Sequence, residues 1–73
     1  MPVTIHCKGS PSWPEKVVIT IQDGWTIADT LQHANITKKR HGIMAIVNGR
    51  LSRLSALVNP DDEITIYPRM GGG

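Results

Sequence analysis

The chain has 73 residues and a mass of 8.0 kDa, which leave room for one domain. Its net charge of +2 is too small an excess to indicate nucleic-acid binding, and no apolar run approaches the ~20 residues that cross a bilayer. A single core of this size typically contributes only ~3–5 kcal/mol of net stability, and a pocket enclosing substrate and catalytic groups would hollow it out. The composition therefore favours a small module that works with partners over a free-standing enzyme.

The single cysteine, Cys7, excludes an internal disulfide framework and favours a reducing compartment. The first residues lack the basic and long apolar segments of a signal peptide, so we expect the protein in the cytoplasm. The three histidines, His6, His33 and His41, have no mutual spacing that would gather a metal ion. Phosphate-binding loops are absent as well. We therefore expect no metal and no cofactor bound by the chain itself, and neither a membrane nor a specific nucleic acid as partner.

The first two predicted elements are strands. The opening residues alternate so that Val3, Ile5 and Cys7 share one face, where we expect the thiol to be buried and inert. A thiol that exchanges with a persulfide is the alternative, and it requires exposure and a lowered pKa. Residues 16–22 are rich in β-branched side chains and predict a second strand.

A change of period then predicts a helix. Thr26 is suited to cap its N-terminus, and Asp29 adds a negative charge in the first turn. We expect the helix to fade near Asn35 and the basic run at residues 38–41 to stay solvated beside its negative end. The apolar stripe consists of Ile27, Leu31 and Ala34.

The next segment predicts a hairpin. Residues 43–47 are apolar throughout, which is typical of a central strand buried on both faces. Asn48-Gly49 is a strong signal for a tight turn into a short strand around residues 50–53. An apolar cluster is expected to follow, formed by Leu54, Leu57 and Val58.

The last predicted strand covers residues 63–67, and Pro68 is expected to stop it. Residues 59–62 form the turn before it. Consecutive carboxylates at Asp61, Asp62 and Glu63 are expected to be solvated there rather than poised as an acid/base pair.

This order predicts an α+β roll of the β-grasp, ubiquitin-like kind: a mixed sheet of four to five strands with one main helix packed on one face. Residues 1–67 would form the β-grasp domain and residues 68–73 a flexible C-terminal tail ending in Gly-Gly-Gly. Glycines without Cβ present a small cross-section, so such a tail can thread a channel and place its carboxylate in a partner's active site. A frayed end is the alternative interpretation.

At these residues the sequence resembles the MoaD/ThiS family, the ubiquitin-like sulfur carriers of molybdopterin and thiamine biosynthesis. Residues 45–50 are similar to the family's apolar strand followed by Val-Asn-Gly, and residues 59–67 to its turn and final strand. Residues 68–73 are similar to the tail that closes on Gly-Gly, and residues 26–31 to the helix opening. Pro60-Asp61 stands where the family commonly has Asp-Gly.

The resemblance implies a reaction cycle centred on the carboxylate of Gly73. An activating enzyme of the ubiquitin-activating kind adenylates it with ATP, a persulfide displaces AMP, and the resulting thiocarboxylate donates sulfur to a downstream synthase. The partner enzyme, not this chain, uses the ATP and the persulfide. Residues that a partner is expected to grip are Tyr67, Pro68, Arg69, Met70, Gly71 and Gly72.

Alternatives remain open from the residues. The same activated glycine can be joined to lysines, which would make the chain a protein modifier, or the fold can be a plain binding module. Tyr67 is expected on the sheet face away from the helix, where it forms an apolar docking patch with either Ile43 or Met44. The continuous apolar run does not say which of the two points outward.

Overall fold

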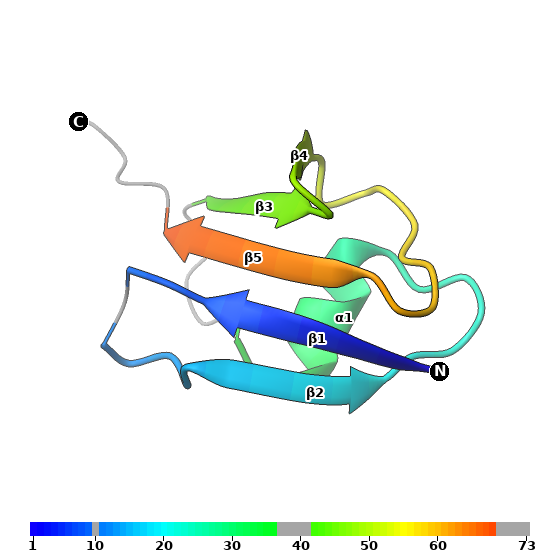
Figure 1. The fold of residues 1–73 in the computed structure, drawn as a ribbon, viewed down its shortest axis with the longest axis horizontal. Helices are drawn as coiled ribbons and strands as arrows, with labels where there is room; N and C mark the ends of the chain where they lie inside the picture. Colours follow the sequence, from blue (N-terminus) through cyan, green and yellow to red (C-terminus); the bar gives the residue numbers. More distant parts are fainter. Residues whose placement is uncertain (10, 37–41, 69–73) are drawn as a thin grey trace.

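The computed structural model describes residues 1–9, 11–36 and 42–68. In chain order their elements are β1 (Pro2–Cys7), β2 (Lys16–Thr20), α1 (Ile27–His33), β3 (Ile43–Val47), β4 (Arg50–Ser52) and β5 (Glu63–Pro68). The strands form one sheet in the order β2-β1-β5-β3-β4, and α1 lies across one of its faces (Figure 1). β1 and β5 are parallel, and the other neighbouring pairs are antiparallel. The predicted β-grasp arrangement is confirmed.

The middle of the sheet is β5, not the apolar segment at residues 43–47 that the sequence favoured. β3 has β5 on one side and only the three-residue β4 on the other. Ala45 is fully buried, whereas its neighbour Met44 is 38% exposed. Burial on both faces was therefore a wrong prediction, because the one helix in the described residues covers a single face of the sheet.

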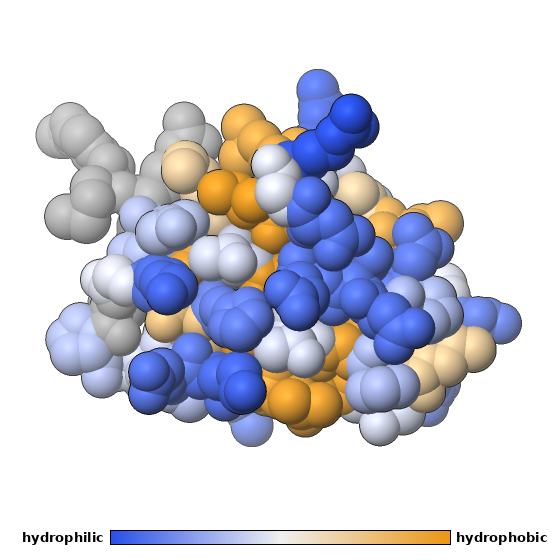
Figure 2. Space-filling view, viewed as in Figure 1, coloured by the Kyte–Doolittle hydropathy of each residue, from blue (hydrophilic) through white to orange (hydrophobic). Residues whose placement is uncertain are grey.

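The opposite face of the sheet lies open, and Figure 2 views the molecule from that side. Hydrophobic residues gather over β3 and β4 and, separately, over β2 at the other edge of the sheet, while the surface over β1 and β5 is mostly hydrophilic. The alternation along the strands explains the division, because polar side chains such as Thr4 and His6 of β1 point to this face. The apolar area on this face is thus divided between the two edges of the sheet, with Val18 of β2 exposed at one of them.

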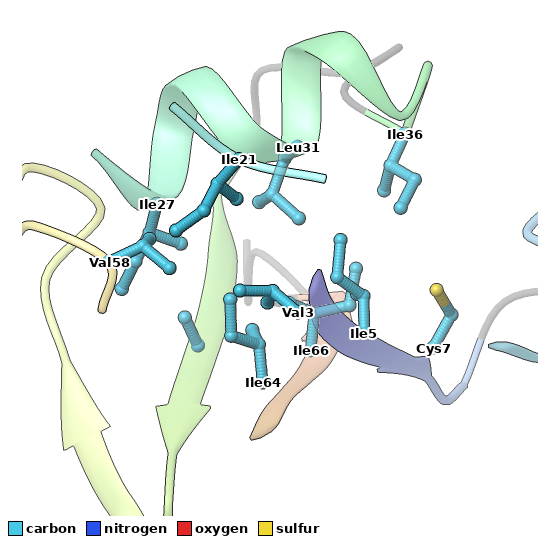
Figure 3. Close-up of a cluster of buried hydrophobic side chains, with 11 residues drawn as sticks. Val3, Ile5, Cys7, Ile21, Ile27, Leu31, Ile36, Val58, Ile64 and Ile66 are labelled. Atoms are coloured by element: carbon cyan, nitrogen blue, oxygen red, sulfur yellow. The ribbon is translucent and has the colours of Figure 1, made fainter. Parts of the chain in front are cut away.

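The core fills the space between the sheet and α1. Ile27 and Leu31 of the helix face Ile5 of β1 and Ile66 of β5, and all four are buried (Figure 3). Ala34 is half-buried against the same cluster, so the predicted helical stripe is confirmed. Within the described residues, the buried apolar side chains are those of Val3, Ile5, Cys7, Ile21, Ile27, Leu31, Ile36, Ala45, Val58, Ile64 and Ile66.

One predicted boundary and one predicted cluster need correction. β2 ends at Thr20 rather than at residue 22, although Ile21 remains buried in the core. Val58 and Leu54 pack on the core as expected, but Leu57 is 64% exposed. The backbone of Leu57 forms an isolated bridge with Thr26.

The helix begins as the sequence predicted. The Thr26 hydroxyl accepts a hydrogen bond from the Asp29 amide at 3.1 Å, and the Asp29 carboxylate accepts one from the Thr26 amide at 2.9 Å. These two bonds form a capping box that satisfies two amides at the helix N-terminus. The helix ends at His33, and Asn35 turns the chain away with φ of 60°. The basic run at residues 38–41 lies outside the described residues.

Candidate functional site

The site predicted at the C-terminal tail begins where β5 leaves the sheet. Tyr67 and Pro68 are the last two described residues, and both belong to β5. Arg69, Met70, Gly71, Gly72 and Gly73 lie outside the described residues. Pro68 was expected to stop the strand, but it is the strand's last residue and stands opposite Ile43 of β3.

Proline is accommodated at this position because of the alternation of backbone groups along β5. The carbonyl of Ile66 accepts a hydrogen bond from the Lys8 amide at 3.0 Å, on the β1 side. Two residues on, Pro68 directs its backbone nitrogen to the same side, at a point where β1 has already ended. The missing N–H of proline therefore breaks no hydrogen bond to β3.

Beside this exit the open face of the sheet carries an apolar patch. Tyr67 and Met44 stand opposite each other in the β5–β3 register and are 37% and 38% exposed. Leu51, 72% exposed, stands opposite Ile46 in the β3–β4 register. The outward patch is defined here as Met44, Ile46, Leu51 and Tyr67. The structure assigns Met44, not Ile43, to this face, because Ile43 packs partly against the core.

The outward patch borders an open groove and the positive charge of Arg53. The groove, about 600 Å³ in volume, runs between the start of β3 and the end of β4 and is lined in part by Met44, Leu51 and Arg53. Arg53 is exposed. Arg50 is exposed as well, but it stands opposite Val47, which packs against the core, and so it belongs to the other face of the sheet. A partner surface that carries apolar side chains together with carboxylates would complement this side of the sheet.

Cys7 is not suited to nucleophilic chemistry in this fold. Its side chain is buried, as predicted, and burial raises the pKa of the thiol. A raised pKa keeps the thiolate, which is the reactive form, scarce at neutral pH. A cavity of about 430 Å³ adjoins it, lined by His6, Lys8, Glu15 and Lys16. Among residues 1–9, 11–36 and 42–68, His, Cys, Asp and Glu side chains form no group able to hold a metal ion.

Asp62 differs from the solvated carboxylate that the sequence suggested. It is buried, and its two oxygens accept hydrogen bonds from the Asn48 side-chain amide and the Asn59 backbone amide, each at 2.9 Å. The Asn48 side-chain oxygen in turn accepts from the Glu63 amide at 3.0 Å. Asp62 therefore joins the β3–β4 turn to the start of β5 and is structural. The Val-Asn-Gly motif was noticed for its turn, not for this contact.

A second pairing that sequence reasoning missed involves Trp25. Its ring stacks on His33 with centroids 4.2 Å apart and planes 13° from parallel. Trp25 lies before the N-cap of α1 and His33 is the last residue of the helix, so the helical pattern of the sequence does not include this pair.

A parallel β1–β5 pair, a helix on one face and a chain that leaves from the middle strand define a ubiquitin-like β-grasp protein. The sequence model of the ThiS family matches residues 8–73, and the chain belongs to that family. Among solved structures, SAMP1 from Haloferax volcanii shares the fold with a TM-score of 0.78 at 17% identity, covering 100% of both chains. A search of curated proteins found no significant match. No helix in the described residues is long and apolar enough to span a membrane.

Proposed function

We propose that this protein is a sulfur carrier whose reactive group is the C-terminal carboxylate of Gly73. The observation that carries the proposal is the family match, which extends through the glycine tail to residue 73. The position of the tail supports it, since five residues follow Pro68, the last residue of the middle strand. Membership of the ThiS family and the β-grasp fold support a carrier or modifier of the ubiquitin-like type. That Gly73 forms a thiocarboxylate, and that this group donates sulfur to an acceptor, is the part we propose.

The chemistry begins with activation, because a carboxylate is a poor electrophile. A partner adenylyltransferase would join Gly73 to AMP with release of pyrophosphate from ATP. The terminal sulfur of a persulfide would then attack the acyl carbon and displace AMP. Cleavage of the resulting acyl disulfide by a thiol leaves the thiocarboxylate and a new disulfide. The chain acts throughout as substrate and carrier, and a downstream synthase takes the sulfur.

The outward patch supplies the docking surface in this proposal. It adjoins the tail exit, because Tyr67 directly precedes Pro68 and stands opposite Met44. A partner bound to the patch would hold the domain while the tail residues Arg69, Met70, Gly71 and Gly72 lead to its active site. The exposed Arg53, which lines the groove beside Met44 and Leu51, favours a partner with a carboxylate at the rim of its apolar surface.

Intact-mass spectrometry of the untagged protein from its own host tests the proposal. A fraction heavier by the difference between sulfur and oxygen is expected, and it should disappear when Gly73 is deleted. The deletion variant should keep the thermal midpoint of the wild type, because no described core residue lies beyond Ile66. Free protein that stays unmodified, with the tail found on lysines of other proteins, would establish a modifier instead. Unmodified protein without adducts, in cells shown to contain the activating enzyme, would leave a binding module.

A further inference from the structure

We infer that Gly9 is a positioning residue for the C-terminal tail: its lack of a side chain lets Pro68 lie against the loop after β1 and so sets the direction in which the chain leaves the sheet. The contact between Gly9 and Pro68 stands on the structure alone. Its consequence for activity rests on the proposed function, because the tail is the reactive segment only in that proposal.

The register of the two central strands brings Gly9 to Pro68. Cys7 is paired with Ile66 in the parallel β1–β5 ladder. Gly9 follows Cys7 by two residues, and Pro68 follows Ile66 by two residues, so the same register places Gly9 beside Pro68. The hydrogen bond from the Lys8 amide to the Ile66 carbonyl continues the pairing past the end of β1. A Cβ atom built on Gly9 would lie 2.8 Å from Cδ and 3.3 Å from Cγ of Pro68. The first of these distances is too short for two carbon atoms in contact.

Pro68 cannot yield to such a Cβ without moving its backbone. The Cδ atom of proline is bonded to the backbone nitrogen, and the ring has no rotatable side-chain bond that would swing it aside. A side chain at position 9 would therefore displace the backbone at Pro68, the residue from which the last five residues continue. Gly9 thus acts on the tail through Pro68 rather than by touching a partner.

Two other glycines separate this effect from backbone strain. Gly9 has φ of 87°, where any L side chain is strained, and Gly24 and Gly49 have nearly the same φ, 87° and 86°. For Gly24 and Gly49, however, no atom of the described residues lies within 4 Å of an added Cβ. Gly24→Ala therefore reproduces the strain of Gly9→Ala without the displacement of Pro68.

The contact itself is tested on the full chain by a double-mutant cycle. Gly9→Ala should raise the unfolding equilibrium constant about tenfold more than Gly24→Ala does, since forcing a methyl group into an occupied position adds to the backbone strain. This excess should vanish in the Pro68→Ala background, in which Cδ and Cγ are gone. A nuclear Overhauser effect between the Gly9 Hα and Pro68 Hδ protons should be present in the wild type. An absent Overhauser effect, or equal destabilisation by both alanines, overturns the contact.

The positioning role is tested by the sulfur-loaded fraction of each variant in its own host, at a temperature where all variants are folded. Wild type and Gly24→Ala should load equally, and Gly9→Ala should load at least about fivefold less, as expected for a misplaced reacting group. Equal loading of Gly9→Ala and wild type overturns the positioning role and leaves the sulfur-carrier proposal intact. A wild type that carries no sulfur overturns the sulfur-carrier proposal and the positioning role with it, while the double-mutant cycle still decides the contact.

Discussion

At the scale of single residues, Asp61 occupies a backbone conformation that favours glycine. It is the third residue of the turn that begins at Asn59, and its φ is 67°. The departure from the family's usual Asp-Gly thus leaves an L side chain in the left-handed region. That conformation costs a non-glycine residue ~1–2 kcal/mol, less for aspartate than for most residues.

Asp61→Gly is therefore expected to stabilise the protein by about 0.5 kcal/mol, since the relief of strain exceeds the entropy that glycine loses on folding. Urea unfolding followed by circular dichroism measures the change. Asp61→Ala is the matched control, because it removes the same carboxylate but keeps a Cβ. If the glycine and alanine variants are equally stable, backbone strain at position 61 has no measurable cost.

Cys7 gives the second prediction at this scale. Burial raises the pKa of its thiol, so the folded state binds this proton more tightly than the unfolded state does. The stabilisation is fully present below the unfolded pKa of about 8.5 and is lost as the pH rises from there through the folded value. Unfolding free energies measured between neutral pH and pH ~10 should fall more steeply for the wild type than for Cys7→Ala. Equal slopes would contradict the shift.

At the scale of elements, the capping box of α1 is expected to respond to both mutation and acid. Thr26→Ala should cost about 1 kcal/mol, because the Asp29 amide loses its acceptor. Hydrogen bonds from Thr26 lower the pKa of the Asp29 carboxyl, so this contribution is present above the unfolded pKa and is lost as the pH falls through the folded value.

Urea unfolding measured from pH ~6 down to ~2 tests the acid response. Asp29→Asn is the control, since an amide oxygen still accepts from the Thr26 amide but does not titrate in this range. The wild type should lose stability more steeply than this variant on acidification. Parallel curves would show that Asp29 contributes nothing through its charge.

The elements also show what local sequence can and cannot predict. Asn48-Gly49 was correctly predicted as a tight hairpin, because both residues adopt positive φ and the turn needs no distant contact. The burial of β3 was predicted wrongly, because a continuous apolar run does not say which faces its neighbours cover. Asp62 was missed for a related reason: its burial depends on Asn48, 14 residues earlier in the chain. The tail residues after Pro68 remain a prediction.

At the scale of the whole molecule, the outward patch and the tail exit lie on the same side of the fold, and the docking proposal can be tested without disturbing the core. Met44→Glu should leave the thermal midpoint nearly unchanged, because the side chain is 38% exposed, and should lower the sulfur-loaded fraction at least about tenfold by burying a charge against the partner. Intact mass of the protein from its own host measures the loading.

Val18→Glu is the matched control for that substitution. Val18 is also apolar and 62% exposed on a strand, but it lies on β2, at the opposite edge of the sheet from β3 and β4. Its variant should load as the wild type does. Equal loss of loading in both variants would assign the effect to added charge in general and not to the outward patch.

The parallel pairing of β1 with β5 also decides how the protein should be attached for binding measurements. Because both strands run in the same direction, Met1 and Pro68 lie at opposite ends of the sheet (Figure 1). A sensor surface coupled through the N-terminus would hold the molecule with its tail end facing the solution. Coupling through Lys8 or Lys16 would do the reverse, because both lysines lie at the tail end of the sheet. Lys16 pairs with His6, and Lys8 follows Cys7. His6 and Cys7 in turn pair with Thr65 and Ile66, near the end of β5. Immobilisation chemistry alone can therefore expose or hide the reactive end of this protein.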